Sequence, residues 1–253
     1  NLVSENWILV DDHAVISAGR GSDVVLRAEM INLSNAQVGN TDKTNTVMWT
    51  GDLNAFGDNA IYAGGIEFDS DAYINVSDYS SLFFYTGQRG IELTGDASQS
   101  TGEVVFDVNN ITVADTGTIG FVSDGAISLT NIAGTAADGI RGTLLVNGSD
   151  VIISDVEFNY ANLIFEGNIT LRGDFLTQHD VDFRGNVKLD APGRTITVTS
   201  EQGSVSMSGT VEALNGEGLV LDAETFARIG NMLNLSSLEV HANDAIYLNG
   251  VVR

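Results

Sequence analysis

Residues 168–189 read Asn-Ile-Thr-Leu-Arg-Gly-Asp-Phe-Leu-Thr-Gln-His-Asp-Val-Asp-Phe-Arg-Gly-Asn-Val-Lys-Leu, and this stretch decides the fold. Three triplets in it, which begin at Ile169, Val181 and Val187, each place a polar residue between two apolar ones. Alternation of this kind is typical of a β-strand that buries one of its faces. Glycine follows two of the triplets and favours tight turns there, because it tolerates positive φ. The stretch therefore predicts short, half-buried strands joined by turns.

Similar triplets recur along the chain at a spacing close to eighteen residues. Four pairs show this spacing: Val151 and Ile169, Leu163 and Val181, Ile169 and Val187, and Val187 and Val205. A β-sandwich would have a strand about every 8–12 residues, without this longer recurrence. Short strands that repeat with a period near twenty residues indicate a solenoid, so we predict an all-β parallel β-helix. The residues expected to point into its core are Ile169, Leu171, Val187, Leu189, Val205 and Met207.

The pattern extends over most of the chain but is less regular in the first hundred residues. Strands are expected there at residues 7–10, 24–26, 47–49, 66–68, 74–76 and 82–84. Residues 39–59 are mostly polar, and we expect this stretch to loop out of the stack. No linker marks a boundary, so residues 1–253 are predicted to form one elongated domain. Six Asn-x-Ser/Thr sequons are interpreted as turns followed by strands: Asn32, Asn75, Asn110, Asn147, Asn168 and Asn234.

Residues 222–233 are expected to interrupt the strands with one short helix packed beside the coils. Asp222 is a residue type that favours a helix N-cap, and Phe226, Ile229 and Leu233 recur at helical spacing. Gly230 weakens such a helix by about 1 kcal/mol relative to alanine. The sequence therefore predicts a single helical insertion in an otherwise all-β chain.

The composition describes a strongly acidic chain that is still able to bury a core. It has 34 acidic and 11 basic residues, for a net charge of −23, while 43% of its residues are hydrophobic. A surface this acidic repels phosphate, which argues against nucleic acid and anionic membranes as partners. The chain has no cysteine, which excludes disulfides and thiol catalysis.

Nothing in the sequence predicts membrane insertion. No run of eighteen apolar residues occurs, and the first residues, Asn1 to Asn6, do not resemble a signal peptide. We therefore expect the sequence to begin after a signal peptide or inside a longer chain.

Two stretches resemble the repeats of filamentous hemagglutinin-type adhesins, which are the cargo proteins of two-partner secretion. One is Thr-Ile-Thr-Val-Thr-Ser-Glu-Gln-Gly-Ser-Val-Ser-Met-Ser-Gly at residues 195–209, a pattern that many β-helices share. The other joins Leu-Asp-Ala-Glu-Thr-Phe-Ala-Arg-Ile-Gly-Asn-Met at residues 221–232 to Ser-Leu-Glu-Val-His-Ala-Asn-Asp-Ala-Ile-Tyr-Leu-Asn-Gly at residues 237–250. Both lie within residues 195–250, which is somewhat less than a quarter of the chain.

The resemblance implies a right-handed β-helix that is exported through an outer-membrane partner pore. It implies an extracellular or cell-surface location and a role in adhesion or biofilm contact. The partners it implies are a receptor on a host cell, on a neighbouring cell or in the matrix, including a glycan receptor. The asparagine–proline motif of the family's amino-terminal secretion domain is missing, which places these residues in the interior or carboxy-terminal part of a longer shaft.

Parallel β-helices also include pectate lyases and polygalacturonases, so an enzyme is the main alternative. Residues 11–13, Asp-Asp-His, faintly resemble a pectate-lyase motif, but their spacing from the preceding tryptophan differs. A lyase also needs basic residues to neutralise the uronate carboxylate and take its proton. The only lysines are Lys43 and Lys188, and the Gly-His-Gly of polygalacturonases is absent. We predict that the protein is not an enzyme and has no catalytic residues.

Three acidic groups are candidates for metal binding. Residues 179–182, His-Asp-Val-Asp, place carboxylates beside an imidazole, but they fit a turn that enters a strand. Residues 52–57 resemble half of an EF-hand loop, although Phe56 replaces an oxygen ligand and Ala63 stands at the twelfth position. The third group surrounds one predicted strand: Asp69, Asp71 and Asp78. The prediction is no metal site and no cofactor.

Three functions are compatible with these observations. The first is a rigid stalk or contact surface of an adhesin. The second is a carbohydrate-binding β-helix whose exposed aromatic residues stack on sugars: Tyr73, Tyr79, Phe84, Tyr85 or Tyr160. The third is a polysaccharide lyase or hydrolase.

The chain stops within an alternating run, Val251-Val252-Arg253, with no capping element. We therefore expect a fragment with open ends, in which either the last coil frays or the ends associate end to end.

Overall fold

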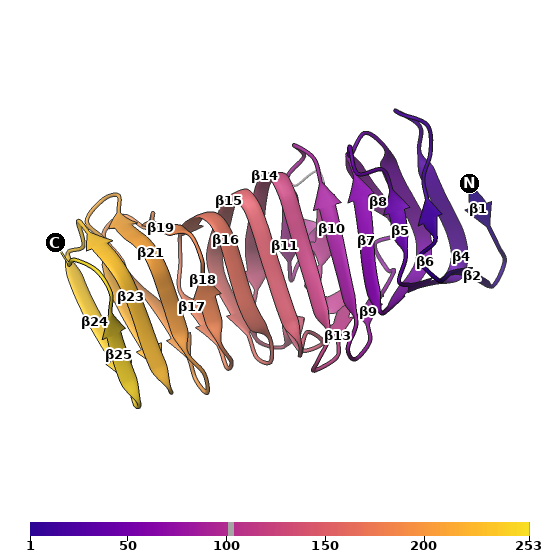
Figure 1. Cartoon of the computed structure of the whole chain (residues 1–253). Helices are drawn as coiled ribbons and strands as arrows, with labels where there is room; N and C mark the ends of the chain where they lie inside the picture. The colour runs from indigo at the N-terminus through magenta and orange to yellow at the C-terminus, as the bar shows by residue number, and fades with distance from the viewer. Residues whose placement is uncertain (101–103, 253) are drawn as a thin grey trace.

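The computed structural model describes residues 1–100 and 104–252 and is nearly all β. Strands make up 63% of it and helices 3%, and parallel coils stack into a β-solenoid of about 11 turns. The stack is elongated, with the N- and C-termini at opposite ends (Figure 1). The predicted parallel β-helix is confirmed. Of the C-terminal run discussed above, Arg253 lies outside the described residues.

Each coil passes over three faces in turn, and strands of successive coils pair in parallel on each face. Strands confined to face one are β1 (Leu2–Val3), β8 (Gly65–Phe68), β11 (Ile91–Thr94), β12 (Val104–Asp107) and β19 (Asn186–Leu189). Face two has β2 (Trp7–Val10), β9 (Ile74–Val76), β13 (Ile111–Val113), β17 (Phe175–Thr177), β20 (Thr195–Ser200), β22 (Gly218–Ala223) and β24 (Ser237–Ala242). Face three has β3 (Val15–Ile16), β5 (Gln37–Gly39), β7 (Asp58–Ala63), β10 (Ser81–Thr86), β18 (Val181–Phe183) and β25 (Ala245–Leu248).

Longer strands bend around a corner and contribute to more than one face. They are β4 (Val24–Ser34), β6 (Thr46–Phe56), β14 (Thr118–Ile132), β15 (Thr143–Phe158), β16 (Asn162–Leu171), β21 (Val205–Ala213) and β23 (Phe226–Leu233). Their pairing shifts register at the corner, as between Gly148 and Asp150, because a bulge re-aims the strand. Three short 3-10 helices lie in the connections: η1 (Ala97–Gln99), η2 (Val108–Asn110) and η3 (Gly134–Ala137).

The core is a set of inward columns in which each side chain stacks on its equivalent in the next coil. Leu171 lies in register with Ile153 on one side and Leu189 on the other, and all three are fully buried. Burying a side chain of this size contributes roughly 1.5–3 kcal/mol. The six residues predicted to form the core are all buried, which confirms the predicted inward face: Ile169, Leu171, Val187, Leu189, Val205 and Met207.

The eighteen-residue recurrence describes part of the stack but not all of it. It holds where β15, β16, β18 and β19 pair, for example between Val151 and Ile169 and between Ile169 and Val187. The predicted equivalence of Val187 and Val205 is wrong, since Val187 pairs with Val211 and Val205 belongs to another face. The coil that follows β19 is longer because a wider turn separates it from β20, so the period changes there.

A column of glycines forms the corner between face three and face one. The column contains Gly148, Gly167, Gly185, Gly209, Gly230 and Gly250. At each of Gly167, Gly185, Gly209 and Gly230, a β-carbon would overlap the carbonyl oxygen of the preceding glycine in the column. The corner is therefore built from backbone packed directly on backbone, which only glycine permits.

Face one contains an extra strand that interrupts its ladder. After β11 the chain passes through η1 and returns as β12, which pairs with β11 on the side that faces β8. Among the described residues, β8 pairs with β6 alone, so no ladder joins it to β12. Faces two and three remain continuous at this level, through β9 and β13 and through β7, β10 and β14. Face one therefore has a seam between β8 and β12.

Two predicted departures from the stack are wrong. The helix expected at residues 222–233 is replaced by the end of β22 and by β23, which pairs with β21 and β25. Ala227 and Ile229 point into the core, so the alternating pattern outweighs the helical spacing. Residues 39–59 do not loop out either, because β6 runs through them and buries Val47, Trp49 and Leu53.

Glu217, in the turn before β22, is a fully buried carboxylate that organises two turns. It accepts hydrogen bonds from the backbone N–H of Ala191 at 3.2 Å and from that of Asn215 at 2.8 Å. The Asn215 side-chain amide also donates to it, at 3.3 Å. Burial acts to raise the pKa of Glu217, but these donors outweigh it and hold the pKa below its ordinary value of 4.5.

We expect Glu217→Gln to lower the free energy of unfolding by roughly 1–3 kcal/mol at neutral pH, because an amide NH₂ would meet a buried N–H donor. A carboxyl with a lowered pKa stabilises the fold above its unfolded pKa, and this contribution is lost as pH falls through the folded value. The difference in the free energy of unfolding between wild type and variant should therefore shrink below about pH 4. Urea denaturation at several pH values measures it, with the exposed Glu224→Gln as control. A difference that is independent of pH would contradict this role.

Candidate functional site

A row of hydrogen-bonded asparagines runs along the outside of face two. Asn32, Asn54 and Asn75 occupy the same position in β4, β6 and β9. The Nδ2 of Asn54 donates to the Oδ1 of Asn32 at 3.1 Å, and the Nδ2 of Asn75 donates to the Oδ1 of Asn54 at 2.9 Å. This amide ladder is aligned with the axis of the stack, because each asparagine belongs to the next coil.

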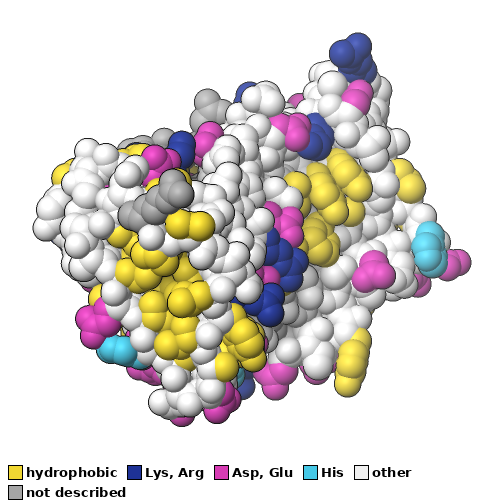
Figure 2. Space-filling model, turned by 60° about the vertical axis from the view of Figure 1, so that its left-hand side comes forward, with side chains coloured by type: hydrophobic (Ala, Val, Ile, Leu, Met, Phe, Trp, Pro, Cys, Tyr) yellow, Lys and Arg dark blue, Asp and Glu magenta, His cyan; other side chains and the backbone are white. Residues whose placement is uncertain are grey.

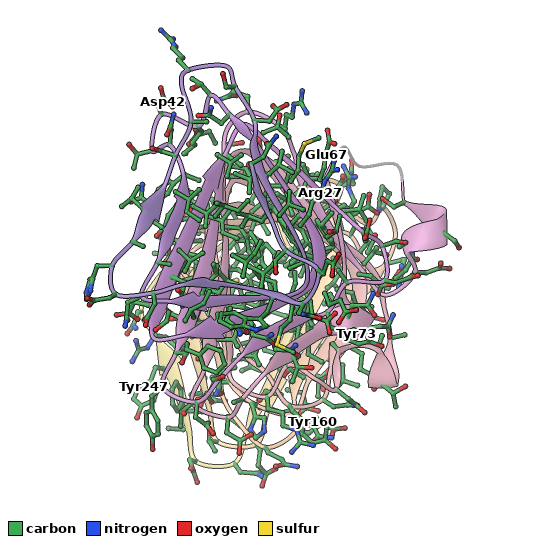
Figure 3. The ribbon with its side chains drawn as sticks, turned by 90° about the vertical axis from the view of Figure 1, so that its right-hand side faces the viewer. Arg27, Asp42, Glu67, Tyr73, Tyr160 and Tyr247 are labelled. Carbon is green, nitrogen blue, oxygen red and sulfur yellow. The ribbon has the colours of Figure 1, made fainter. Side chains whose placement is uncertain are left out.

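A second outward row lies beside the ladder on the same strands. Trp7, Met30 and Asp52 are in register across β2, β4 and β6. Tyr73 follows at the start of β9, where its N–H donates to the Oδ1 of Asp52 at 3.0 Å. Trp7 is 59% exposed and Tyr73 is 49% exposed. Figure 3, which views the stack from its N-terminal end, shows Tyr73 on the outside of the coils.

The N-terminal part of the two rows, from Trp7 and Leu9 to Asn32 and Asp52, borders a shallow groove of about 620 Å³. We call the surface formed by both rows the amide platform: Trp7, Leu9, Met30, Asn32, Asp52, Asn54, Tyr73 and Asn75. It combines exposed aromatic and apolar side chains with amides that both donate and accept hydrogen bonds. Its charged groups, Asp52 and the neighbouring Glu29, are acidic. Such a surface suits a polar, uncharged ligand with an apolar side.

The sequence interpretation found one residue of this platform, Tyr73, and missed the asparagines. The missed signal was present, because Asn32, Asn54 and Asn75 recur at the length of one coil. The turns predicted at the sequons of Asn32 and Asn75 are wrong, because both residues lie within strands, β4 and β9. Asn54 belongs to the segment that resembles half of an EF-hand loop. The structure instead places residues 52–56 within the strand β6 rather than in a loop.

The other aromatic residues proposed as sugar contacts lie in different surroundings. Tyr79 is exposed in a turn with positive φ. Tyr160 is partly exposed, and the guanidinium of Arg141 lies 5.4 Å from its ring. Phe84 was expected on the surface but points into the core, where its ring lies 4.9 Å from that of Phe106. The reason is register, because Phe84 belongs to the inward-facing positions of β10.

Tyr85 belongs to a small aromatic ladder on face three. Its ring stacks on that of Tyr62 with centroids 4.7 Å apart, and Phe83 lies beside it at 5.9 Å. Burial, and then the nearby phenol of Tyr62, raise the pKa of Tyr85. Figure 2 shows hydrophobic side chains gathered on the N-terminal half of this side of the molecule. The rings face each other, so this ladder presents mostly edges to solvent.

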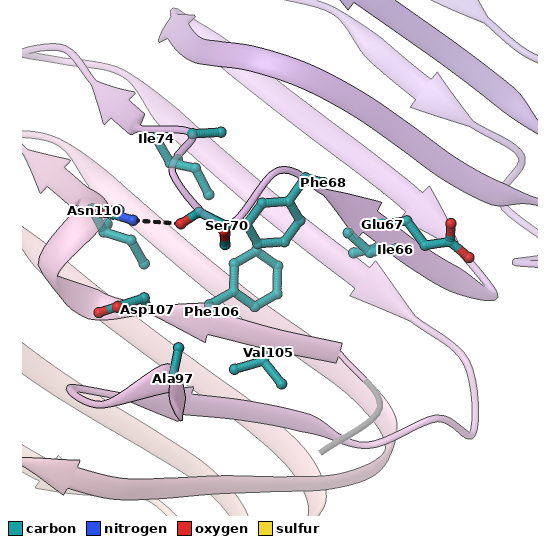
Figure 4. Close-up of a pocket in the computed structure, with 12 residues that line it drawn as sticks. Ile66, Glu67, Phe68, Ser70, Ile74, Ala97, Val105, Phe106, Asp107 and Asn110 are labelled. Carbon is teal, nitrogen blue, oxygen red and sulfur yellow. Dashed lines mark hydrogen bonds between the residues drawn. The ribbon is translucent and has the colours of Figure 1, made fainter. Parts of the chain in front are cut away.

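A hollow of about 340 Å³ lies at the seam between β8 and β12 (Figure 4). The rings of Phe68 and Phe106 meet there, with centroids 5.1 Å apart. Asn110 donates through Nδ2 to the carbonyl of Ser70 at 2.9 Å and ties the two sides together. The carboxylate of Asp107 stands at the edge. The missing ladder of face one accounts for this hollow.

The two groups of histidine and aspartate candidates differ in their surroundings. In residues 179–182, Asp180 accepts from the N–H of Ser204 at 2.7 Å, and Asp182 pairs with Arg184 at 2.7 Å. Residues 11–13 form an exposed turn in which Asp12 and His13 have positive φ.

The third candidate metal group is not brought together as a site. Asp69 and Asp71 are exposed in the turn that follows β8, whereas Asp78 accepts from the hydroxyl of Thr116 at 2.9 Å. In residues 1–100 and 104–252, no group of three or more His, Asp or Glu side chains is arranged to hold a metal ion.

The sequon asparagines contribute to the stack. Five of them donate a side-chain hydrogen bond to another part of the chain: Asn75, Asn110, Asn147, Asn168 and Asn234. Asn32 accepts one in the ladder. Their amides therefore hold neighbouring segments together.

The fold defines this protein as a member of the structural class of parallel β-solenoids. No protein-family model, curated protein or solved structure matches the chain. Within the described part of the chain, no helix has both the length and the apolar character needed to cross a bilayer.

Proposed function

We propose that this protein is a structural and adhesive segment of a secreted or surface-exposed bacterial protein. It acts as a rigid stalk or as a surface for contact with cells or biofilm. The observation that carries the proposal is the long stack of about 11 parallel coils, whose outer faces present rows of repeated side chains. A solenoid of this kind separates its two ends and offers extended lateral surfaces for binding.

The resemblance to filamentous hemagglutinin-type repeats supports an extracellular or bacterial cell-surface location. It also supports export through an outer-membrane partner pore. The expected partners are receptors on a host cell, on a neighbouring cell or in the matrix. The net charge of −23 argues against nucleic acid and against insertion into anionic membranes.

Carbohydrate binding is the second candidate, and the amide platform is the observation that favours it. Amides beside exposed aromatic rings match the hydroxyls and the apolar faces of sugars. A polysaccharide lyase or hydrolase is a weaker candidate, because the two carboxylates beside His179 already have partners: Asp180 accepts from the N–H of Ser204 and Asp182 pairs with Arg184.

Adhesion of coated microspheres tests the leading proposal. Beads that carry the folded chain should adhere to epithelial cell layers or to biofilm matrix more than beads that carry an equally acidic globular protein. Beads coated with the Leu171→Asp variant, whose core is disrupted, serve as a matched control. Equal adhesion of all three would contradict the proposal.

The chain of residues 1–253 is also expected to self-associate through its ends. The inward residues Ile246 and Leu248 of β25 are 46% and 61% exposed, and at the opposite end Leu2, in register with the buried Leu26, is 42% exposed. Figure 2 shows hydrophobic side chains gathered at this C-terminal end. Because both ends expose core positions, the ends can meet head to tail, a contact that does not close on itself. Sedimentation velocity should show association that rises with concentration, and a strict monomer would contradict it.

A further inference from the structure

We propose that the amide platform on face two binds a linear, uncharged glycan that lies along the axis of the stack. The proposal rests on the carbohydrate recognition suggested above, and it names the site, the ligand class and the orientation. Three features of the platform carry it: the spare hydrogen-bonding capacity of the ladder, the placement of its aromatic rings and its charge.

The asparagine ladder keeps part of its hydrogen-bonding capacity for a ligand. A side-chain amide has two N–H donors and an oxygen that can accept twice. Asn54 uses one N–H toward Asn32 and accepts once from Asn75, so one donor and one lone pair remain. A sugar hydroxyl both donates and accepts, so it can satisfy such a pair. The ladder also fixes the orientation of each amide before a ligand arrives, which lowers the entropy lost on binding.

The aromatic rings stand at the two ends of the platform. Trp7 lies on β2 and Tyr73 at the start of β9, three coil steps apart. Neighbouring strands are about 4.8 Å apart, so the rings are separated by about 14 Å along the axis. The amides lie beside the line that joins them. A chain of several sugar rings that runs along the axis reaches both aromatics and the ladder, whereas one that crosses the axis reaches only one ring.

The charge of the platform selects among glycans. Asp52 and Glu29 line the groove, and the whole chain has a net charge of −23. A uronate or sialylated chain would be repelled, because two like charges at short range disfavour binding. An uncharged glycan is not repelled in this way, and its hydroxyls can form hydrogen bonds with the amides.

Tryptophan fluorescence provides a direct test, because the chain has only two tryptophans. Trp49 is 2% exposed in the core, so changes in solvent contact come from Trp7. Titration with a β-1,4-linked glucose hexasaccharide should shift the emission to shorter wavelength and protect it from acrylamide. Glucose itself should bind at least tenfold more weakly, since it cannot span the platform. A galacturonic acid hexasaccharide should give no shift.

Variants assign the effect to the platform. Asn54→Ala removes the central amide and should weaken binding roughly fivefold, which corresponds to about one hydrogen bond. Trp7→Ala should weaken it at least tenfold by calorimetry, because an aromatic contact is lost. Asp222→Ala, at an exposed outward position of β22, should bind as wild type does. Circular dichroism checks that each variant keeps its strands.

Two results would overturn the proposal in different ways. If no uncharged glycan binds, on an array or in titration, both carbohydrate recognition and the site are wrong, while the stalk role stands. If the hexasaccharide binds wild type and both platform variants equally, carbohydrate recognition stands and the site is wrong. A shift in Trp7 emission that depends on protein concentration without sugar would mean that a second copy of the chain covers the platform, which also overturns the proposal.

Discussion

Replacing Leu171 by aspartate is expected to lower the free energy of unfolding by about 4 kcal/mol or more. Leu171 is fully buried between Ile153 and Leu189, so the carboxylate would have no water and no partner. The substitution also removes a leucine from a packed column and leaves space that its neighbours fill only in part. Urea denaturation followed by circular dichroism measures the loss.

The adjacent residue gives a matched control. Thr170 lies on the same strand but points outward, with Lys188 as its neighbour in the next coil. Thr170→Asp should change stability by less than about 1 kcal/mol, because the new carboxylate stays in water beside a lysine. Comparable losses at the two positions would contradict this assignment of the inward and outward faces of β16.

Gly185→Ala is expected to have the second largest effect. A β-carbon at Gly185 would overlap the carbonyl oxygen of Gly167 in the preceding coil. Overpacking usually costs roughly 1–3 kcal/mol, and we expect about 3 kcal/mol or more here because the obstacle is backbone rather than a side chain that can turn away. The strands on both sides of the corner would have to separate to make room.

The control is a glycine in open surroundings with ordinary φ. At Gly19 the nearest atom to a β-carbon would be the hydroxyl of Ser22, at 3.9 Å. Gly19→Ala should therefore be neutral or slightly stabilising, since alanine has fewer unfolded conformations to lose. Thermal denaturation of the two variants separates the corner effect from the general effect of losing a glycine. Equal melting temperatures would show that the corner can accept a side chain.

The fold was predictable where one coil repeats the last. Alternation at Ile169 and Leu171 and the recurrence at Val187 and Leu189 correspond directly to buried columns. The prediction failed at residues 222–233, where Phe226, Ile229 and Leu233 fit a helix as well as a strand. Pairing with β21 and β25 decided between them, and such pairing depends on distant residues that local spacing does not include.

The candidate site was less predictable than the fold, for two physical reasons. Its members come from four coils, so their proximity depends on the register between strands rather than on local sequence. Exposure of an aromatic residue depends on the same register, which is why Tyr73 was placed correctly and Phe84 was not. Recurrence of one polar residue type at the coil length was the usable signal, and it identifies Asn32, Asn54 and Asn75.

The parallel ladders have a mechanical consequence for the proposed stalk role. Their hydrogen bonds are slanted, as in any parallel ladder, but each one joins a coil to the next and so bears load when the two ends are pulled apart. Tension therefore acts on the outermost coil first and peels it from its neighbour, leaving the rest intact. A folded coil contributes about 4.8 Å of height, whereas about 20 released residues extend to about 70 Å. Each coil that detaches would lengthen the tether more than tenfold relative to its folded height and dissipate the load before an attachment at its tip breaks.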